Sequence, residues 1–441
     1  MVIQELFAVD SVISAGIVVL FLIMVYAMNH LPKKKFSFAS RVLIGTGCGT
    51  VFGLAVYGLG AAGAGGLTTA GVSQWFSAVS MIYLGLFRML IGPVIFICTA
   101  RMVIHTPAYK VTPREVKVKK QVNTLMVALS CGVGLLFGIL FHVGSGEGGF
   151  GAVRTGGESI PEIVLGLMPV NGAADLLLGR VVAVFVAGGL GGIAARRMSG
   201  KYMDTVKPFF DLTDAAFSIM GSVCKTVIAW KPAGAAAIMA ALTAVSGPEV
   251  LWRIIKFLLV LTLAAGVMLA IQLLLSAVCG VSPAAFFRAG KEAMVKALKT
   301  RSGSACLPEA QKALAEGLGL KKEITNEVSA YAISSGMQGC AALFPAMALV
   351  FTVHMAGGTF TPGMIAAALI VVTVVSYGIT GAPGTATMAE FAAVMGTGME
   401  GAVSGLGAMI AIDPIGDVPR TLINVTGCMT NAIIAERRLR E

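Results

Sequence analysis

The run FLLVLTLAAGVMLAIQLLL fills residues 257–275 and contains 19 residues without one charge. A helix needs about 20 apolar residues to cross the hydrocarbon core of a bilayer, so this run predicts a membrane-spanning helix. Further apolar runs lie at 15–28 (AGIVVLFLIMVYAM) and 135–141 (LLFGILF). Over all 441 residues, 56% are hydrophobic and only 12% are charged, against about 25% charged in a soluble domain. The sequence therefore predicts an all-α polytopic membrane protein and excludes a disordered chain, a collagen and an ordinary soluble enzyme.

The apolar segments allow nine crossings to be drawn. They lie near residues 10–30, 38–63, 72–106, 118–143, 158–195, 208–244, 250–281, 324–354 and 400–436. Several are longer than the roughly 20 residues that a bilayer requires, so we expect tilted or broken helices.

Basic residues predict the orientation of these crossings. They gather after the first, third, fifth, seventh and ninth crossings, at Lys33–Lys35 and Arg41, Lys110–Lys120, Arg196–Lys207, Arg288–Arg301 and Arg437–Arg440. The loops between them are poor in base, and cytoplasmic loops carry the excess of lysine and arginine. We therefore expect a multi-pass protein of the cell (inner) membrane with its N-terminus outside and its C-terminus in the cytoplasm. The net charge of +11 is then a topology signal, and no nucleic-acid partner is expected.

Two segments do not fit simple crossings, because each lies between two ends on the same side. Residues 283–317 and 359–398 each contain two helical arms around a small, polar turn, TRSGSACLP at 300–308 and GITGAPGTAT at 378–387. Such turns are tolerated at membrane depth only where they line a cavity or the protein interior. We interpret both as re-entrant helical hairpins of opposite orientation, an inverted repeat that is typical of secondary transporters. Tight packing of small residues between helices is the alternative interpretation.

The last crossing contains the most polar stretch of the chain, AIDPIGDVPRTLINVTGC at 411–428. Helical spacing puts Asp413, Asp417, Arg420, Asn424 and Cys428 on one face. Charges inside a membrane helix are costly and usually functional. An aspartate can bind an ammonium group and an arginine can bind a carboxylate through two hydrogen bonds, so the stripe suits an amino-acid ligand. A purely structural ion pair between Asp417 and Arg420 is the alternative.

The preceding crossing is interrupted as well. In AISSGMQGCAALFPAM at 332–347, Gly336, Gly339 and Pro345 are expected to break the helix and free backbone carbonyls. Carbonyls that are freed near the membrane midplane can bind a cation, although a packing kink explains the pattern equally well.

These motifs resemble those of the dicarboxylate/amino acid:cation symporter family, the relatives of the glutamate transporters. The two hairpin turns and DVPRTLINVTG at 417–427 match the family's hairpins and substrate motif, and FRMLIGPVIF at 87–96 and VLIGTGCGTVFGL at 42–54 match earlier helices. The motif GMQGCAALFPAM at 336–347 and the additional N-terminal helix most resemble the L-cystine uptake branch. The resemblance implies a homotrimer in which a transport domain moves against a scaffold like an elevator.

The resemblance also implies a domain organisation. Residues 1–37 would form the extra N-terminal transmembrane helix, and 38–245 mainly scaffold and trimerisation helices, part of which contributes to the transport domain. Residues 246–441 would form the transport core. That core would comprise hairpin 1 at 283–317, a broken helix at 324–354, hairpin 2 at 359–398 and the substrate helix at 400–436.

Residue roles follow from the resemblance by position. Ser302, Gly303 and Ser304 would cradle the substrate α-carboxylate, and Asp417 would bind its ammonium group. Arg420 would bind the distal carboxylate, with hydrogen bonds from Thr421 and Asn424. The remaining implied substrate-site residues are Cys340 and the gate tip, Gly381, Ala382, Pro383 and Gly384.

The cation sites of the family are altered in this chain. Gln338 and Cys428 replace its sodium-binding carboxylates, Gly336 replaces an asparagine, and Val127 stands where the family has a tyrosine. A backbone cation site could survive, formed by Ser334, Met337, Ser376, Tyr377 and Ile379. We therefore expect weak or no sodium dependence, with H⁺ or Na⁺ as the coupling cation and no other cofactor.

Together these observations predict an ion-coupled symporter that imports L-cystine or a related amino acid, not an enzyme. A C4-dicarboxylate or acidic amino-acid carrier is the alternative, although Asp417 favours a substrate with an ammonium group. Outside the transporters, a channel would need polar rings repeated along a pore, whereas the sequence has one polar cluster. An intramembrane enzyme is the second alternative outside the transporters. The sequence predicts a small-molecule substrate and the lipid bilayer as partners.

Overall fold

The computed structural model describes residues 11–63, 69–105, 112–146, 167–379 and 381–440. In these ranges every regular element is a helix, and nine helical stretches are long and apolar enough to cross a membrane. The prediction of an all-α polytopic membrane protein is confirmed. The start of the first predicted crossing and the first part of the fifth, 158–166, lie outside the described residues.

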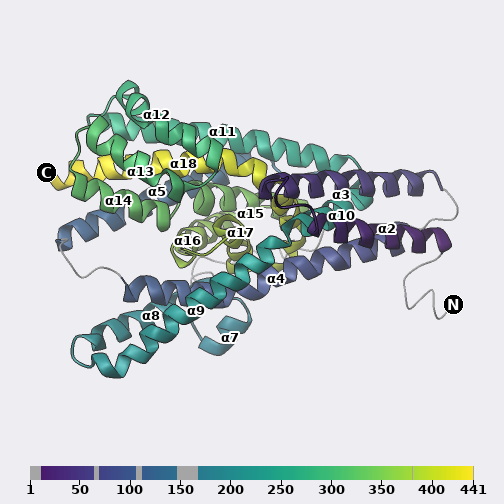
Figure 1. Ribbon diagram of the computed structural model, residues 1–441, viewed down its shortest axis with the longest axis horizontal. Coiled ribbons are helices and arrows are strands. Elements are labelled where there is room, and N and C mark those ends of the chain that lie inside the picture. The colour runs from purple at the N-terminus through teal and green to yellow at the C-terminus, as the bar shows by residue number, and fades with distance from the viewer. Residues whose placement is uncertain (1–10, 64–68, 106–111, 147–166, 380, 441) are drawn as a thin grey trace.

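The helices are named in Figure 1. In chain order they are α2 (Val12–Asn29), α3 (Phe38–Ala61), α4 (Thr69–Ile104), α5 (Pro113–Leu140), α7 (Gly172–Leu177), α8 (Val181–Ser199), α9 (Met203–Ala229), α10 (Lys231–Ser246), α11 (Glu249–Val278), α12 (Pro283–Thr300), α13 (Gly303–Lys312), η2 (Ala313–Gly317), α14 (Lys322–Ser334), η3 (Gly339–Leu343), α15 (Phe344–Met355), α16 (Pro362–Gly378), α17 (Thr385–Gly396), η4 (Glu400–Gly405) and α18 (Leu406–Arg440).

One group of helices comes from the N-terminal half and consists of α2, α3, α4, α8, α9 and α10. Its tightest contact joins α3 to α10, which lie side by side in Figure 1. The backbone of α10 at Pro232 and Ala236 occupies the space that a Cβ atom would need at Gly45 and Gly49 of α3. Small residues allow this close approach, as is common between membrane helices.

A second group consists of α5 and the helices from α11 to α18. The long helix α18 runs beside α11 and α14, and α5 packs on α15, α16 and α18. Phe257 of α11 meets the rings of Phe344 and Phe351 edge to face, at centroid distances of 5.7 and 5.4 Å. Thus α5 packs with the C-terminal half of the chain, although it precedes α8, α9 and α10 in sequence.

Both predicted hairpins are helix–turn–helix units. In the first, α12 ends at Thr300, Arg301 reverses the chain with a φ of 53°, and Ser302 caps α13. In the second, α16 ends at Gly378 and α17 begins after Gly384, whose φ is 70°. The broken helix is present too, because α14 ends at Ser334 and the chain resumes as the π-helical turn η3, which leads into α15.

The predicted crossing at 208–244 differs from the structure, which has two helices there. The helix α9 ends at Ala229, and α10 begins at Lys231 after the break at Trp230. Pro232 follows at once, and proline fits the first turn of a helix because that turn needs no backbone donor.

The predicted crossing at 158–195 is not one continuous helix over its described part, residues 167–195. The helix α8 begins at Val181, after the short helix α7 and a turn in which Gly179 has a φ of 66°. The buried carboxylate of Asp175 accepts hydrogen bonds from the backbone of Val170 and Asn171 and from Arg180, which holds this turn in place.

Candidate functional site

Arg420 lies at the centre of a buried polar cluster on α18. Its side chain is 1% exposed, and its Nη2 donates to the Asp413 carboxylate and to the Asp413 carbonyl at 3.2 Å. The guanidinium lies over the ring of Phe344, 4.0 Å from its centroid, which is a cation–π contact. Nε and Nη1 have no hydrogen-bond partner among the described residues. The arginine therefore keeps N–H groups that can bind a carboxylate.

Asp417 lies beside Arg420 on the side that opens to solvent. Its side chain is 29% exposed, and its Oδ1 lies 3.3 Å from the guanidinium Nη2. Thr421 donates to the same oxygen at 3.4 Å. A carboxylate with exposed surface next to a buried arginine gives two opposite charges to which a zwitterion could bind.

Asn424 joins α18 to the broken helix. Its Oδ1 accepts from the backbone N–H groups of Gly339, at 2.7 Å, and Cys340, at 3.3 Å. Its Nδ2 donates to the sulfur of Cys340 at 3.0 Å. These contacts place Cys340 beside Asp417, with 3.9 Å between sulfur and carboxylate. The structure thus brings together Cys340, Asp417, Arg420, Thr421 and Asn424, five of the residues that the resemblance implies for the substrate site.

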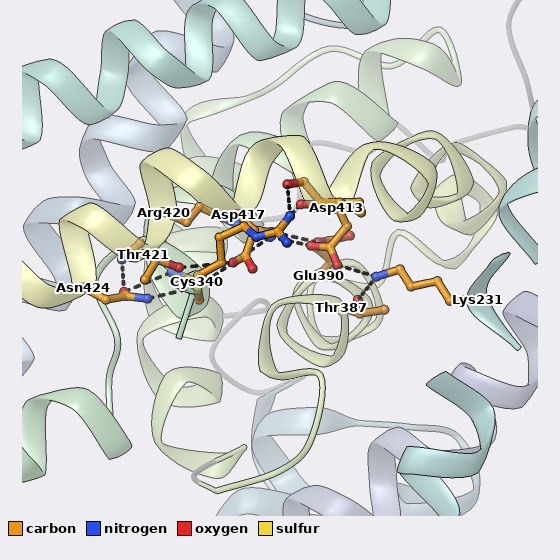
Figure 2. A network of polar contacts seen from close by, with 12 residues as sticks. Lys231, Cys340, Thr387, Glu390, Asp413, Asp417, Arg420, Thr421 and Asn424 are labelled. Atoms are coloured by element: carbon orange, nitrogen blue, oxygen red, sulfur yellow. Dashed lines mark hydrogen bonds and ion pairs between the residues drawn. The ribbon is translucent and has the colours of Figure 1, made fainter. Parts of the chain in front are cut away.

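Two charged residues of the cluster were not identified from the sequence, Lys231 of α10 and Glu390 of α17 (Figure 2). The ammonium of Lys231 donates to the Asp413 carboxylate and to the hydroxyl of Thr387, the latter at 3.3 Å. Glu390 is fully buried, and its Oε1 lies 4.0 Å from Nη1 of Arg420. Each is an isolated charge in an apolar segment, KPAGAAAIMAAL at 231–242 and MAEFAAVM at 388–395, and this signal could have revealed them.

The tip of the first hairpin lies against α18. Arg301 donates to the carbonyl of Pro414 at 3.3 Å, next to Asp413 in the chain. Ser302 caps α13 by accepting from the N–H of Ala305, while Ser304 is exposed. A Cβ atom at Gly303 would lie 3.2 Å from Ile333 of α14. The predicted cradle is therefore adjacent to the charged stripe.

The tip of the second hairpin, residues 381–384, lies elsewhere. Ala382 and Pro383 line a small cavity with residues of α4 and α9, and a Cβ atom at Gly381 would lie 3.3 Å from the ring of Phe217. Among the described residues no hydrogen bond or ion pair joins these four residues to α18. The predicted gate tip is thus packed against the first helix group.

The segments of the predicted backbone cation site do meet. The N–H of Gly336 donates to the carbonyl of Ser376 at 3.2 Å, and the φ of Gly336 is 77°. A Cβ atom there would lie 3.0 Å from Val127, so glycine fits both the space and the conformation. The hydroxyl of Ser334 bonds back to its own helix at Ala330. Met337, Tyr377 and Ile379 flank the same break.

Neutral side chains stand at Gln338 and Cys428, the positions where the resemblance implies cation-binding carboxylates. Gln338 donates to Asn431 at 3.1 Å and accepts from Gln272 at 2.8 Å, and Asn431 donates to Asn123 at 2.8 Å. The thiol of Cys428 bonds to the carbonyl of Val425. These side chains satisfy one another and supply no carboxylate, so they do not fit a carboxylate-assisted sodium site.

Comparison with known proteins agrees with these motifs. The family described as the sodium:dicarboxylate symporter family matches residues 38–438. The L-cystine uptake protein TcyP of Bacillus licheniformis is 27% identical over 430 residues, which cover 92% of this chain and 91% of that protein. Proteins of the same name from Bacillus anthracis and Bacillus subtilis are each 26% identical, and both alignments cover 96% of this chain and 94% of the relative.

Proposed function

Because this chain belongs to the sodium:dicarboxylate symporter family, we propose that it imports L-cystine or a closely related amino acid. It is a transporter, not an enzyme, so its side chains bind and release a substrate and perform no chemical step. The proposal extends the L-cystine uptake for which its relatives are named to a chain with its own set of buried charges.

The observation that supports this substrate class is the arrangement of Asp417 and Arg420. The partly exposed carboxylate of Asp417 would bind an ammonium group, and the unused N–H groups of Arg420 would bind a distal carboxylate. Asn424 and Thr421 would orient the ligand, and the N–H groups around Ser302–Ser304 would receive the α-carboxylate. A substrate without an ammonium group would leave Asp417 next to another anion, which disfavours a plain dicarboxylate.

The two helix groups support an elevator-type mechanism. In this proposal α2, α3, α4, α8, α9 and α10 form the scaffold of a homotrimer, and α5 with α11–α18 form the moving transport core. The first hairpin would open to the cytoplasm and the second to the outside, with an outside N-terminus and a cytoplasmic C-terminus. The hairpin-2 tip, which packs on α9, would then act as the extracellular gate.

Uptake into proteoliposomes tests the function. Labelled cystine, glutamate and succinate would be offered to the purified protein, first in exchange with unlabelled internal substrate and without any ion gradient. Exchange of cystine with little exchange of succinate supports the proposal. Exchange of succinate in preference to cystine would establish the dicarboxylate alternative instead.

A further inference from the structure

We propose that Glu390 is the proton-binding residue of this carrier and that it takes up one proton when substrate occupies Arg420. The proposal rests on the proposed function and adds the identity of the coupling ion and its binding group. It starts from a buried carboxylate that the substrate-binding roles leave unexplained.

The surroundings of Glu390 do not provide what an ionised carboxylate needs. The residue is 1% exposed, and neither oxygen has a hydrogen-bond donor among the described residues. Its nearest cation is Arg420, with 4.0 Å between Oε1 and Nη1. Burying a carboxylate without hydrogen bonds is costly unless a cation or a proton compensates it.

The charges around Glu390 come from several helices. Asp413, Asp417 and Arg420 lie on α18 and Lys231 on α10, and Asp413, Arg420 and Lys231 act on Glu390 electrostatically. Two neutral titratable groups lie beside the same charges, Tyr83 of α4 near Asp413 and Cys340 of η3 near Asp417. A third cation, Arg301 at the tip of the first hairpin, also acts on Asp417 electrostatically.

Substrate binding changes this balance at one point. Lys231 and Arg420 both bond to Asp413, so that carboxylate is compensated with or without substrate. The closest cationic group to Glu390 is the unbonded Nη1 of Arg420, which is also a position that a substrate carboxylate would occupy. Two anions would then compete for one guanidinium edge. The competition ends if Glu390 takes a proton from water, because its O–H can then donate to the substrate carboxylate.

This exchange couples the two ligands. A substrate that favours protonated Glu390 must, by linkage, be favoured by a proton in return, with the same factor. The proton on Glu390 offsets the second anion, the substrate carboxylate, that arrives beside Arg420. The occupied cluster with its proton would cross the membrane with the transport core, and the proton would return to water in the cytoplasm when the substrate leaves.

Proteoliposomes that contain no sodium test the proposal. With one proton per substrate and the membrane potential clamped, an inward gradient of one pH unit supports up to about tenfold accumulation of cystine. Glu390→Gln keeps the shape but binds no proton, so we expect the gradient-driven accumulation of cystine, measured relative to the variant's own exchange without a gradient, to disappear. Glu436→Gln is the matched control, because Glu436 is equally buried but is paired with Arg440 and the N–H of Lys321; it should retain both activities.

The outcomes separate the two proposals. Wild-type protein that does not exchange cystine refutes the proposed function, and this inference with it. Exchange without any effect of the pH gradient refutes the proton coupling alone, and a full gradient effect in Glu390→Gln refutes the assignment to Glu390. If Glu390→Gln does not fold, calorimetry of cystine binding to the wild type in buffers of different ionisation enthalpy decides: about one proton taken up supports the proposal, and none overturns it.

Discussion

Replacing Arg420 by lysine should weaken binding of two-carboxylate substrates far more than binding of neutral amino acids. The ammonium of lysine can still pair with Asp413, which keeps one of the contacts that Arg420 makes. It cannot also provide the N–H groups that Nε and Nη1 leave free in the wild type. Lysine therefore preserves the charge of the cluster and removes the donors for the distal carboxylate.

The size of the effect follows from the burial of this contact. Loss of a buried charge-assisted contact at a binding site costs about 2–5 kcal/mol, or about 30- to several-thousand-fold in affinity. We expect a loss in this range for cystine and glutamate, and a change of less than about threefold for serine and alanine, which need Asp417 and the hairpin tip. Arg420→Ala is a poorer test, because it leaves three carboxylates with Lys231 alone and should also lower the melting temperature.

Binding of cystine, glutamate and serine to purified Arg420→Lys would be measured by calorimetry together with the melting temperature. Arg101→Lys is the control, because Arg101 also pairs with an aspartate, Asp214, but is 40% exposed and lies on α4 away from the cluster. An equal loss for all three substrates, accompanied by a lower melting temperature, would show that Arg420 only holds the helix through Asp413 and Asp417.

Three further predictions concern topology, the coupling ion and helix packing. A cysteine introduced at the exposed position 304 should react with a membrane-impermeant thiol reagent added from the cytoplasmic side, and a cysteine introduced at position 385 should react with the reagent added from outside. Labelling of both positions from the same side would contradict the inverted hairpins. Replacing sodium by choline at constant pH should change cystine uptake by less than about twofold, because neutral side chains stand at the implied cation positions; a steep, cooperative sodium dependence would show this wrong. Gly49→Leu should destabilise the protein by about 1–3 kcal/mol, since α10 backbone occupies that space, whereas Gly47→Leu, with nothing within 4 Å, should leave the melting temperature unchanged.

The sequence determined the elements of this protein that depend on local patterns. Apolar runs such as 257–275 predict membrane helices because a bilayer requires a fixed length of apolar chain. The turns at 300–308 and 378–387 predict hairpins because small residues permit chain reversal. The spacing of Asp417, Arg420 and Asn424 puts them on one helix face whatever the helix packs against. The break near Gly336 was predictable because glycine and proline interrupt the hydrogen bonding of a helix.

The tertiary structure decided which elements meet. Lys231 and Asp413 are 182 residues apart in the chain, and no helical period relates Glu390 to Arg420, so their ion pairs follow only from how α10, α17 and α18 pack. The break between α9 and α10 lies just before Lys231 and Pro232, but proline is also tolerated inside membrane helices, so only the structure showed that the chain stops there and starts a new helix. The amide network that links Gln272, Gln338, Asn431 and Asn123 also draws on four separate segments. In the sequence, each of these residues is only a polar group within an apolar segment. Their tertiary contacts show that the four side chains hydrogen-bond with one another.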